Sequence, residues 1–253
     1  MLQRAEVMAP AEAACNHALV LDDTLVDGYS CKANLCIAFN RDWTQATHAI
    51  ERALQLAPSN ARAVLQAGNL ARTLGNFEQA ADHLRQAVSL DPLNLTGHIW
   101  LANVYIALGR FEDAVNIMHQ ALDLNPRRVV LNTVLANALI CQGRYEAAHE
   151  RGLMEPAGFW QDFSMIVSLY ALNRQDEADQ RFNALLETYS EEAPFQIAEI
   201  YCARGEPDQA FAWLERSCAL HDNGLVQLLG SSWLKSLHND SRRPAILNKM
   251  NIH

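Results

Sequence analysis

Apolar side chains return along much of this chain at steps of three and four residues, a spacing that places them on one face of an α-helix. Segment 61–94 shows the pattern clearly, with two such stretches separated by a break at Gly75. Glycine takes the left-handed conformation that ends a helix at little cost, and Pro92 cannot continue the second stretch. The pattern therefore predicts two antiparallel helices in this segment.

The two-helix pattern repeats with a nearly fixed period. A small residue followed by asparagine occurs at Asn34, Asn69, Asn103 and Asn137, which are separated by 35, 34 and 34 residues. The expected ends of the second helices keep the same steps and lie at residues 18–23, 53–58, 87–92 and 121–126. A period near 34 residues is typical of a helical repeat array, in which each helix pair buries its apolar face by stacking on its neighbours.

The unit that begins at Leu95 resembles the tetratricopeptide repeat (TPR). Residues of the size and type found in that family stand at Leu101, Ala102, Tyr105, Gly109, Phe111, Ala114, Met118, Ala121 and Pro126. His98 departs from the family pattern, and the next unit, which begins at Val129, loses the match at Gly152. The resemblance implies an all-α fold, a right-handed TPR superhelix (α-solenoid) of about six helix pairs with a C-terminal capping helix.

The clarity of the repeat differs along the chain. We expect an incomplete N-terminal repeat over residues 1–24, a regular TPR array over 25–155, degenerate TPR units over 156–222 and a C-terminal capping segment over 223–253. Helix pairs are expected at residues 25–58, 59–92, 93–126, 127–155, 157–190 and 191–222. The segment Met154–Gly158, which contains a proline, is the clearest break in the array.

The N-terminal stretch is hard to match to a complete repeat. Residues 10–23 fit a second helix with its exit, which leaves only residues 1–9 for the first helix of that pair. We therefore expect the chain to be the C-terminal piece of a longer protein. The apolar face under Ala14, Ala18 and Leu21 would lack a neighbour, which predicts end-to-end self-association through this face.

The C-terminal stretch, residues 223–252, does not repeat. It is similar to the closing segment of TPR regions in bacterial signalling proteins, where such regions follow winged-helix DNA-binding domains, class III nucleotide cyclases or serine/threonine kinase domains. The similar features are a basic, polar helix after residues 233–237, an end near Met250, and Asp42-Trp43 before an early second helix. The resemblance implies a sensory or regulatory module of a signalling protein, and a free-standing scaffold for a multiprotein complex is the alternative.

Composition excludes several other classes of function. A net charge of −9 and a pI near 5.4 disfavour nucleic acid as a partner, because phosphate binding needs a basic surface. No run of apolar residues is long enough to span a membrane, and the six cysteines show no metal-binding spacing, which favours buried thiols in the cytoplasm. No catalytic or cofactor-binding motif is present, so we expect neither cofactor nor metal, and catalysis only in a missing domain.

The repeated asparagines are the strongest candidates for a binding site. The TPR resemblance implies that Asn34, Asn69, Asn103 and Asn137 lie on the first helices and face the concave groove, where an amide can donate to and accept from the backbone of an extended peptide. The alternative is that these amides only stabilise neighbouring helices. Other groove positions hold Arg62, Gln66, Arg72, Trp100 and Thr133. Two interpretations of Trp100 are open, a binding anchor and a packing residue.

Overall fold

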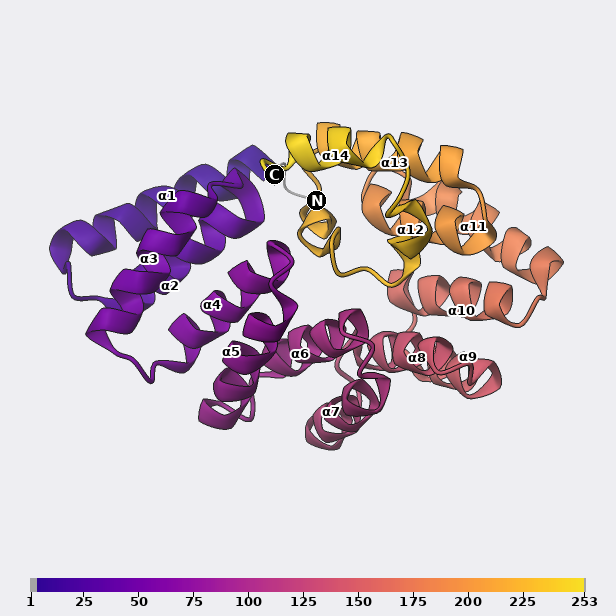
Figure 1. Ribbon diagram of the computed structural model, residues 1–253, viewed down its shortest axis with the longest axis horizontal. Coiled ribbons are helices and arrows are strands. Elements are labelled where there is room, and N and C mark those ends of the chain that lie inside the picture. The colour runs from indigo at the N-terminus through magenta and orange to yellow at the C-terminus, as the bar shows by residue number, and fades with distance from the viewer. Residues whose placement is uncertain (1–3, 253) are drawn as a thin grey trace. The chain divides into compact units, whose positions relative to one another are not determined.

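The computed structural model describes residues 4–252, and every regular element within them is helical (Figure 1). Six consecutive helix pairs follow one another along the chain. They are α2 (Val26–Leu35, continued by the π-turn Cys36–Asn40) with α3 (Trp43–Leu56), α4 (Ala61–Thr73) with α5 (Phe77–Leu90), α6 (Leu95–Ala107) with α7 (Phe111–Leu124), α8 (Leu131–Cys141) with α9 (Tyr145–Met154), α10 (Phe159–Ala171) with α11 (Gln175–Tyr189), and α12 (Pro194–Arg204) with α13 (Pro207–Ala219). The all-α repeat fold that the period predicted is confirmed.

The chain divides into two compact units, residues 1–97 (unit 1) and residues 98–253 (unit 2). Unit 1 contains α1 to α5, and unit 2 contains α7 to α14 together with most of α6. No helix within residues 4–252 combines the length and the apolarity needed to cross a lipid bilayer.

The pair α4–α5 in unit 1 shows how a repeat sequence makes its helices. The side chain of Asn60 accepts a hydrogen bond from the amide of Ala63 at 2.9 Å and so caps the start of α4. Gly75, with a φ of 82°, makes the turn between the helices. Gly68 lets α5 approach closely, because a β-carbon there would lie only 2.6 Å from Cγ of Leu84, which is fully buried. Replacing Gly68 by alanine would therefore push the two helices apart.

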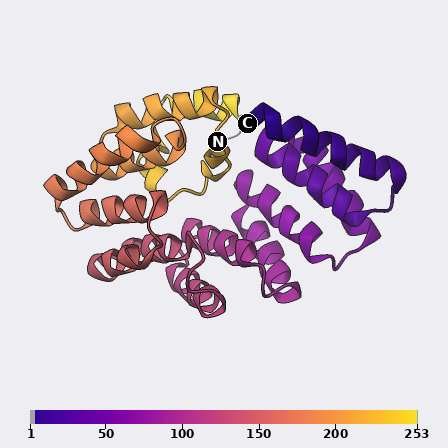
Figure 2. The same ribbon diagram turned by 180° about the vertical axis from the view of Figure 1, so that it is seen from behind.

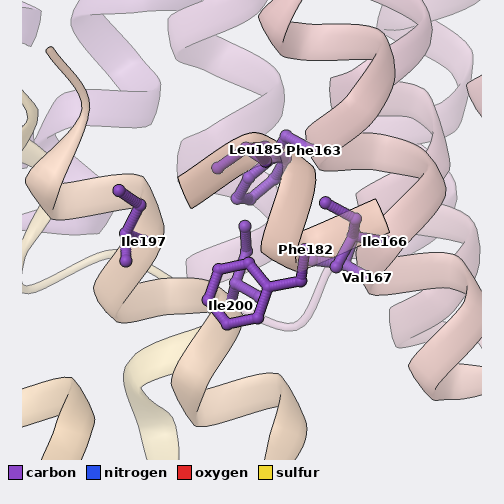
Figure 3. Packing of buried hydrophobic residues seen from close by; sticks show 7 residues of the cluster. All are labelled: Phe163, Ile166, Val167, Phe182, Leu185, Ile197 and Ile200. Atoms are coloured by element: carbon purple, nitrogen blue, oxygen red, sulfur yellow. The ribbon is translucent and has the colours of Figure 1, made fainter. Parts of the chain in front are cut away.

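Unit 2 has an aromatic-rich core between α10, α11 and α12 (Figure 3). Its seven buried members are Phe163, Ile166, Val167, Phe182, Leu185, Ile197 and Ile200. Phe182 is fully buried, and a side chain of this kind contributes about 1.5–3 kcal/mol through the apolar surface that it removes from water. The degenerate repeats are therefore well packed, although their sequence spacing is irregular.

The break at Met154–Gly158 is a structured joint in unit 2. Glu155 is 2% exposed, and its carboxylate accepts hydrogen bonds from the backbone amides of Val130 at 2.5 Å and Thr133 at 3.0 Å. These amides begin α8 and have no partner within that helix, so the carboxylate caps its positive end. The residue after the broken repeat thus holds the start of that same repeat in place.

The N-terminal helix α1 runs without interruption from Arg4 to Leu21. The prediction that a second helix begins at Pro10 is wrong, because residues 4–9 form the first turns of the same helix. Proline lacks only one backbone donor, so a helix can continue through it at the cost of one hydrogen bond and some strain. Residues 1–3 lie outside the described residues. Val20 and Leu21 at the end of α1 are 83% and 75% exposed.

The C-terminal segment closes unit 2 and includes the predicted capping helix. It consists of two 3₁₀ helices, η2 (Asn223–Gln227) and η3 (Trp233–Leu237), and the short helix α14 (Arg243–Lys249). Helix α14 packs beside α13, as both views of the ribbon show (Figures 1 and 2). Buried leucines fix the segment to α13, and the guanidinium of Arg242 lies 4.2 Å from the ring centroid of Phe211 on that helix.

Candidate functional site

The four repeated asparagines lie on the first helices of their pairs, but their surroundings differ. Asn34 on α2 is exposed, whereas Asn69 on α4 is buried. Asn103 on α6 and Asn137 on α8 are half-buried.

In unit 1, Asn69 belongs to a hydrogen-bond network within α4. Its Nδ2 donates to Oε1 of Gln66 at 3.2 Å, and its Oδ1 accepts from Nε of Arg72 at 3.0 Å. The three side chains share one face of the helix, because they are three residues apart. All three are less than a tenth exposed, and burial lowers the pKa of Arg72 to about 10, which still leaves it protonated at neutral pH. The amide of Asn69 is thus held by its neighbours on the same helix.

Arg62, the other predicted groove cation of unit 1, has a different environment. It is exposed, and its Nη1 lies 3.5 Å from Oδ1 of Asp27 on α2. This ion pair links adjacent helix pairs at the surface, where solvent screens it.

In unit 2, Asn137 contacts a residue that is distant in sequence. Its Oδ1 accepts a hydrogen bond from Oγ of Ser232 at 2.9 Å, and the thiol of Cys141 donates weakly to the same oxygen at 3.8 Å. Asn137 and Ser232 are 95 residues apart. The C-terminal segment therefore lies on the predicted binding surface of α8.

Three consecutive residues of that segment, Ser231 to Trp233, make contacts of this kind, and we call them the Ser-Ser-Trp turn. Oγ of Ser231 donates to Oε1 of Glu199 on α12 at 2.6 Å. The indole ring of Trp233 packs edge-on against Phe163 of α10, with the ring centroids 6.5 Å apart. The turn thus touches the first helices of three successive pairs, namely α8, α10 and α12.

The remaining predicted residues of unit 2 have separate roles. The hydroxyl of Thr133 donates to the backbone carbonyl of Trp160 at 3.1 Å, which joins α8 to α10. Trp100 on α6 is half-buried. Sequence reasoning placed Thr133 and Trp100 on the correct helices, but it missed the Ser-Ser-Trp turn, because this turn has no counterpart one repeat earlier.

The electrostatics under the Ser-Ser-Trp turn are set by burial. The pKa of Glu199 is raised to about 8, chiefly because burial desolvates the carboxylate; the hydrogen bond from Ser231 lowers it and the charge of Asp222 raises it. Burial also raises the pKa of Cys141, and that of Cys202 to about 11, so both thiols stay protonated at neutral pH. A neutral Glu199 and protonated thiols make this an uncharged, hydrogen-bonding surface.

Among residues 4–252, no group of three or more His, Cys, Asp or Glu side chains could hold a metal ion. What the described surface offers is hydrogen-bond acceptors and aromatic rings, which are the groups that bind a peptide.

Comparison with known proteins identifies the repeat. Models of the tetratricopeptide repeat match residues 38–94, 71–119 and 106–151. No curated protein sequence matches the chain. The matched segments together cover the stretch in which the 34-residue period is most regular.

Solved structures share the fold. PilW, a widely conserved type IV pilus biogenesis factor, aligns with a TM-score of 0.59 at 19% identity over 84% of this chain and 98% of its own. PilF of Pseudomonas aeruginosa aligns with a TM-score of 0.57 at 17% identity over 79% and 92%. A mutant O-GlcNAc transferase of Thermobaculum terrenum is 30% identical over 56% of this chain with a TM-score of 0.46, and the chain spans only 26% of its length.

Proposed function

The chain belongs to the tetratricopeptide-repeat family, and we propose that it binds an extended segment of a partner protein on the first-helix surface of unit 2. The fold is that of a protein-interaction module. The observation that carries the proposal is the contact between Ser232 and Asn137, because a non-repeating stretch of polypeptide lies against a repeated asparagine. A surface that holds one such stretch has the shape and the acceptors to hold another.

The chemistry of the surface supports a peptide ligand. A primary amide has both donor and acceptor groups, so Asn103 and Asn137 can pair with the backbone or the hydroxyl groups of a bound chain. The half-buried ring of Trp100 lies on α6, within the same unit, and large rings of this kind supply much of the affinity at protein interfaces. Asn34, Asn69, Arg62, Gln66 and Arg72 belong to unit 1, and their part in binding remains a prediction.

We further propose that this module is the regulatory C-terminal part of a larger bacterial signalling protein. The support is the closing segment, which resembles those of TPR regions behind signalling domains and which ends in the short basic helix α14. The second candidate is a scaffold for assembly, which the exposed apolar residues Val20 and Leu21 at the end of α1 favour.

Photo-crosslinking in the native host tests the proposal. A photoreactive phenylalanine derivative replaces Trp100 in one variant and Tyr145 in a control variant, because Tyr145 is an exposed aromatic residue on the second helix α9. We expect a discrete protein adduct at Trp100 and none at Tyr145. Equal labelling at both positions, or none at either, would refute a partner site on the first-helix surface. An adduct with a signalling domain would favour the first context, and one with a structural assembly would favour the second.

A further inference from the structure

Two residues of the Ser-Ser-Trp turn, Ser232 and Trp233, are less buried than the leucines that flank the turn. Leu228 before the turn and Leu234 after it are 5% and 2% exposed, and both line a small cavity together with Phe211 and Leu214 of α13. Ser231 is 9% exposed, whereas Ser232 and Trp233 are half-buried, and residues 228–232 belong to neither 3₁₀ helix. Release of the turn from the surface would break two hydrogen bonds and one ring contact, and it would leave the flanking leucines in place.

The contacts of the turn are those of a bound ligand. Its two hydroxyl groups donate to Asn137 and Glu199, which lie on different helices, and its indole ring meets Phe163 on a third. These receiving groups belong to the repeat array itself.

We infer that the Ser-Ser-Trp turn is a built-in ligand of this surface, and that a partner segment with two adjacent hydroxyl residues followed by an indole ring binds there by displacing it. This inference rests on the proposed function and names both the partner chemistry and the regulation of the same site. Access to the surface is controlled by how often the turn leaves it.

The hydrogen-bond acceptors on Asn137 and Glu199 determine which partner segments can bind to this surface. Oδ1 of Asn137 and the carboxyl of Glu199 both receive hydrogen bonds from adjacent residues of the turn, so a partner must present two neighbouring donors. Serine or threonine satisfies this condition. An aspartate or glutamate at the first position would lack the hydroxyl donor and would place a negative charge close to Asp222, which raises the cost of binding.

The aromatic position is equally specific. Phe163 packs against Trp160 with the ring centroids 5.9 Å apart and against Phe159 with the centroids 6.3 Å apart, so the indole of Trp233 extends an existing row of rings. Edge-on contacts within such a row are more favourable than contacts with an aliphatic side chain of the same area. A partner without the ring would leave this row incomplete.

Tethering makes the turn a strong competitor. A segment joined to its own site by a few residues acts at an effective concentration on the order of millimolar. A free peptide with the same contacts therefore binds weakly to the native chain, and it binds tightly once the turn is released. Displacement by a partner requires contacts beyond those of the turn, for example at Trp100.

Two variants of the full chain test this inference. Trp233→Ala removes the ring contact and releases the turn. Ser232→Cys places a thiol near the native Cys141, because Ser232 and Cys141 both donate to Oδ1 of Asn137, so that oxidised glutathione can join the two thiols as a disulfide and lock the turn in place. The probe is a fluorescein-labelled peptide of residues 228–238, and its matched control carries alanine in place of tryptophan. Binding is measured by fluorescence polarisation.

We expect Trp233→Ala to bind the probe at least about 10-fold more tightly than the native chain, because an interface ring of this kind is a typical hot spot. Oxidised Ser232→Cys should bind at least about 10-fold more weakly than the same protein after reduction. The native chain, treated with the same oxidant, should not change, and the control peptide should bind weakly throughout.

Equal binding to the locked and the reduced protein would overturn the inference. So would the absence of probe binding to a Trp233→Ala chain whose thermal unfolding is native-like. If Trp233→Ala fails to fold, the locked variant decides alone. A partner that crosslinks at Trp100 but binds the locked protein as well as the reduced one would leave the proposed function standing and refute only the displacement.

Discussion

Asn69 in unit 1 and Asn137 in unit 2 stand at the same repeat position, but the hydrogen-bond partners of their side chains differ. Asn69 is flanked at three residues on either side by Gln66 and Arg72, which pair with both ends of its amide. The equivalent neighbours of Asn137, Val134 and Ile140, are apolar and cannot do so. Its acceptor is met instead by Ser232 from the far end of the chain. A repeated polar residue thus becomes structural or available for binding according to its helical neighbours.

The two units differ most strongly in the protonation state of a buried ionisable side chain. Between pH 5 and 8, Arg72 of unit 1 stays protonated, because its lowered pKa of about 10 still lies above this window. Glu199 of unit 2 has its pKa raised to about 8, against about 4.3 in the unfolded chain. Within this window the folded chain binds a proton at Glu199 that the unfolded chain does not, so the contribution of Glu199 to stability falls as pH rises from about 4.3 towards 8.

The largest expected effect is therefore a loss of stability with rising pH that depends on Glu199. The slope is at most about 1.4 kcal/mol per pH unit, and Glu199→Gln should remove it. Urea unfolding at pH 5, 6.5 and 8 measures both proteins. Burial lowers the pKa values of His149 and His238, so their contribution to stability falls as the pH is lowered, which is opposite to the effect of Glu199. The informative quantity is therefore the difference in unfolding free energy between the native chain and the variant. Parallel curves for the two proteins would contradict the assignment.

The second largest effect on stability is expected for the hydrogen-bond network of Gln66, Asn69 and Arg72 in α4. Asn69→Ala removes both hydrogen bonds of the amide, one of them to a buried guanidinium, and should lower the free energy of unfolding by about 2–3 kcal/mol. Asn137→Ala is the matched control, because it deletes the same side chain at the same repeat position and loses one half-buried bond, worth about 0.5–1.5 kcal/mol. Chemical denaturation compares them, and equal losses would erase the distinction between the two units.

The smallest effect on stability should accompany a clear effect on binding. The double variant Asn103→Ala, Asn137→Ala should weaken binding of the crosslinked partner by roughly 5- to 150-fold, which corresponds to the loss of one or two hydrogen bonds. Its melting temperature should change little. Titration calorimetry and thermal unfolding together decide the question, and a large fall in melting temperature with unchanged affinity would make these asparagines structural.

The helical repeat could be predicted because its determinants are local. Residues such as Gly75 and Pro92 mark the ends of helices, and the 34-residue period places each repeated asparagine on a first helix. Even the α4 network could have been recognised, since Gln66 and Arg72 stand three residues from Asn69. The continuation of α1 through Pro10 does not follow from the sequence, because a proline is more common in the first turn of a helix than in its interior.

Other features depend on contacts between distant residues and leave no periodic signal. The cap that Glu155 provides for α8 joins residues that are 25 and 22 positions apart, across the point where the repeat pattern breaks. The contact between Ser232 and Asn137 depends on how the C-terminal segment folds back, which no local pattern encodes. The candidate surface could thus be located from the sequence, but not its occupant.

The place of the Ser-Ser-Trp turn at the end of unit 2 has a consequence for the newly made protein. Helices α8, α10 and α12 are synthesised before residues 231–233 are joined to the chain. At about 5–20 residues per second, the delay between the end of α12 and the turn amounts to a few seconds. We expect a partner that is present at the site of translation to meet Asn137 of α8 before the turn can compete for it. In the finished protein the turn already covers this surface. Whether a partner occupies the surface therefore depends on when the partner meets the chain as well as on its affinity.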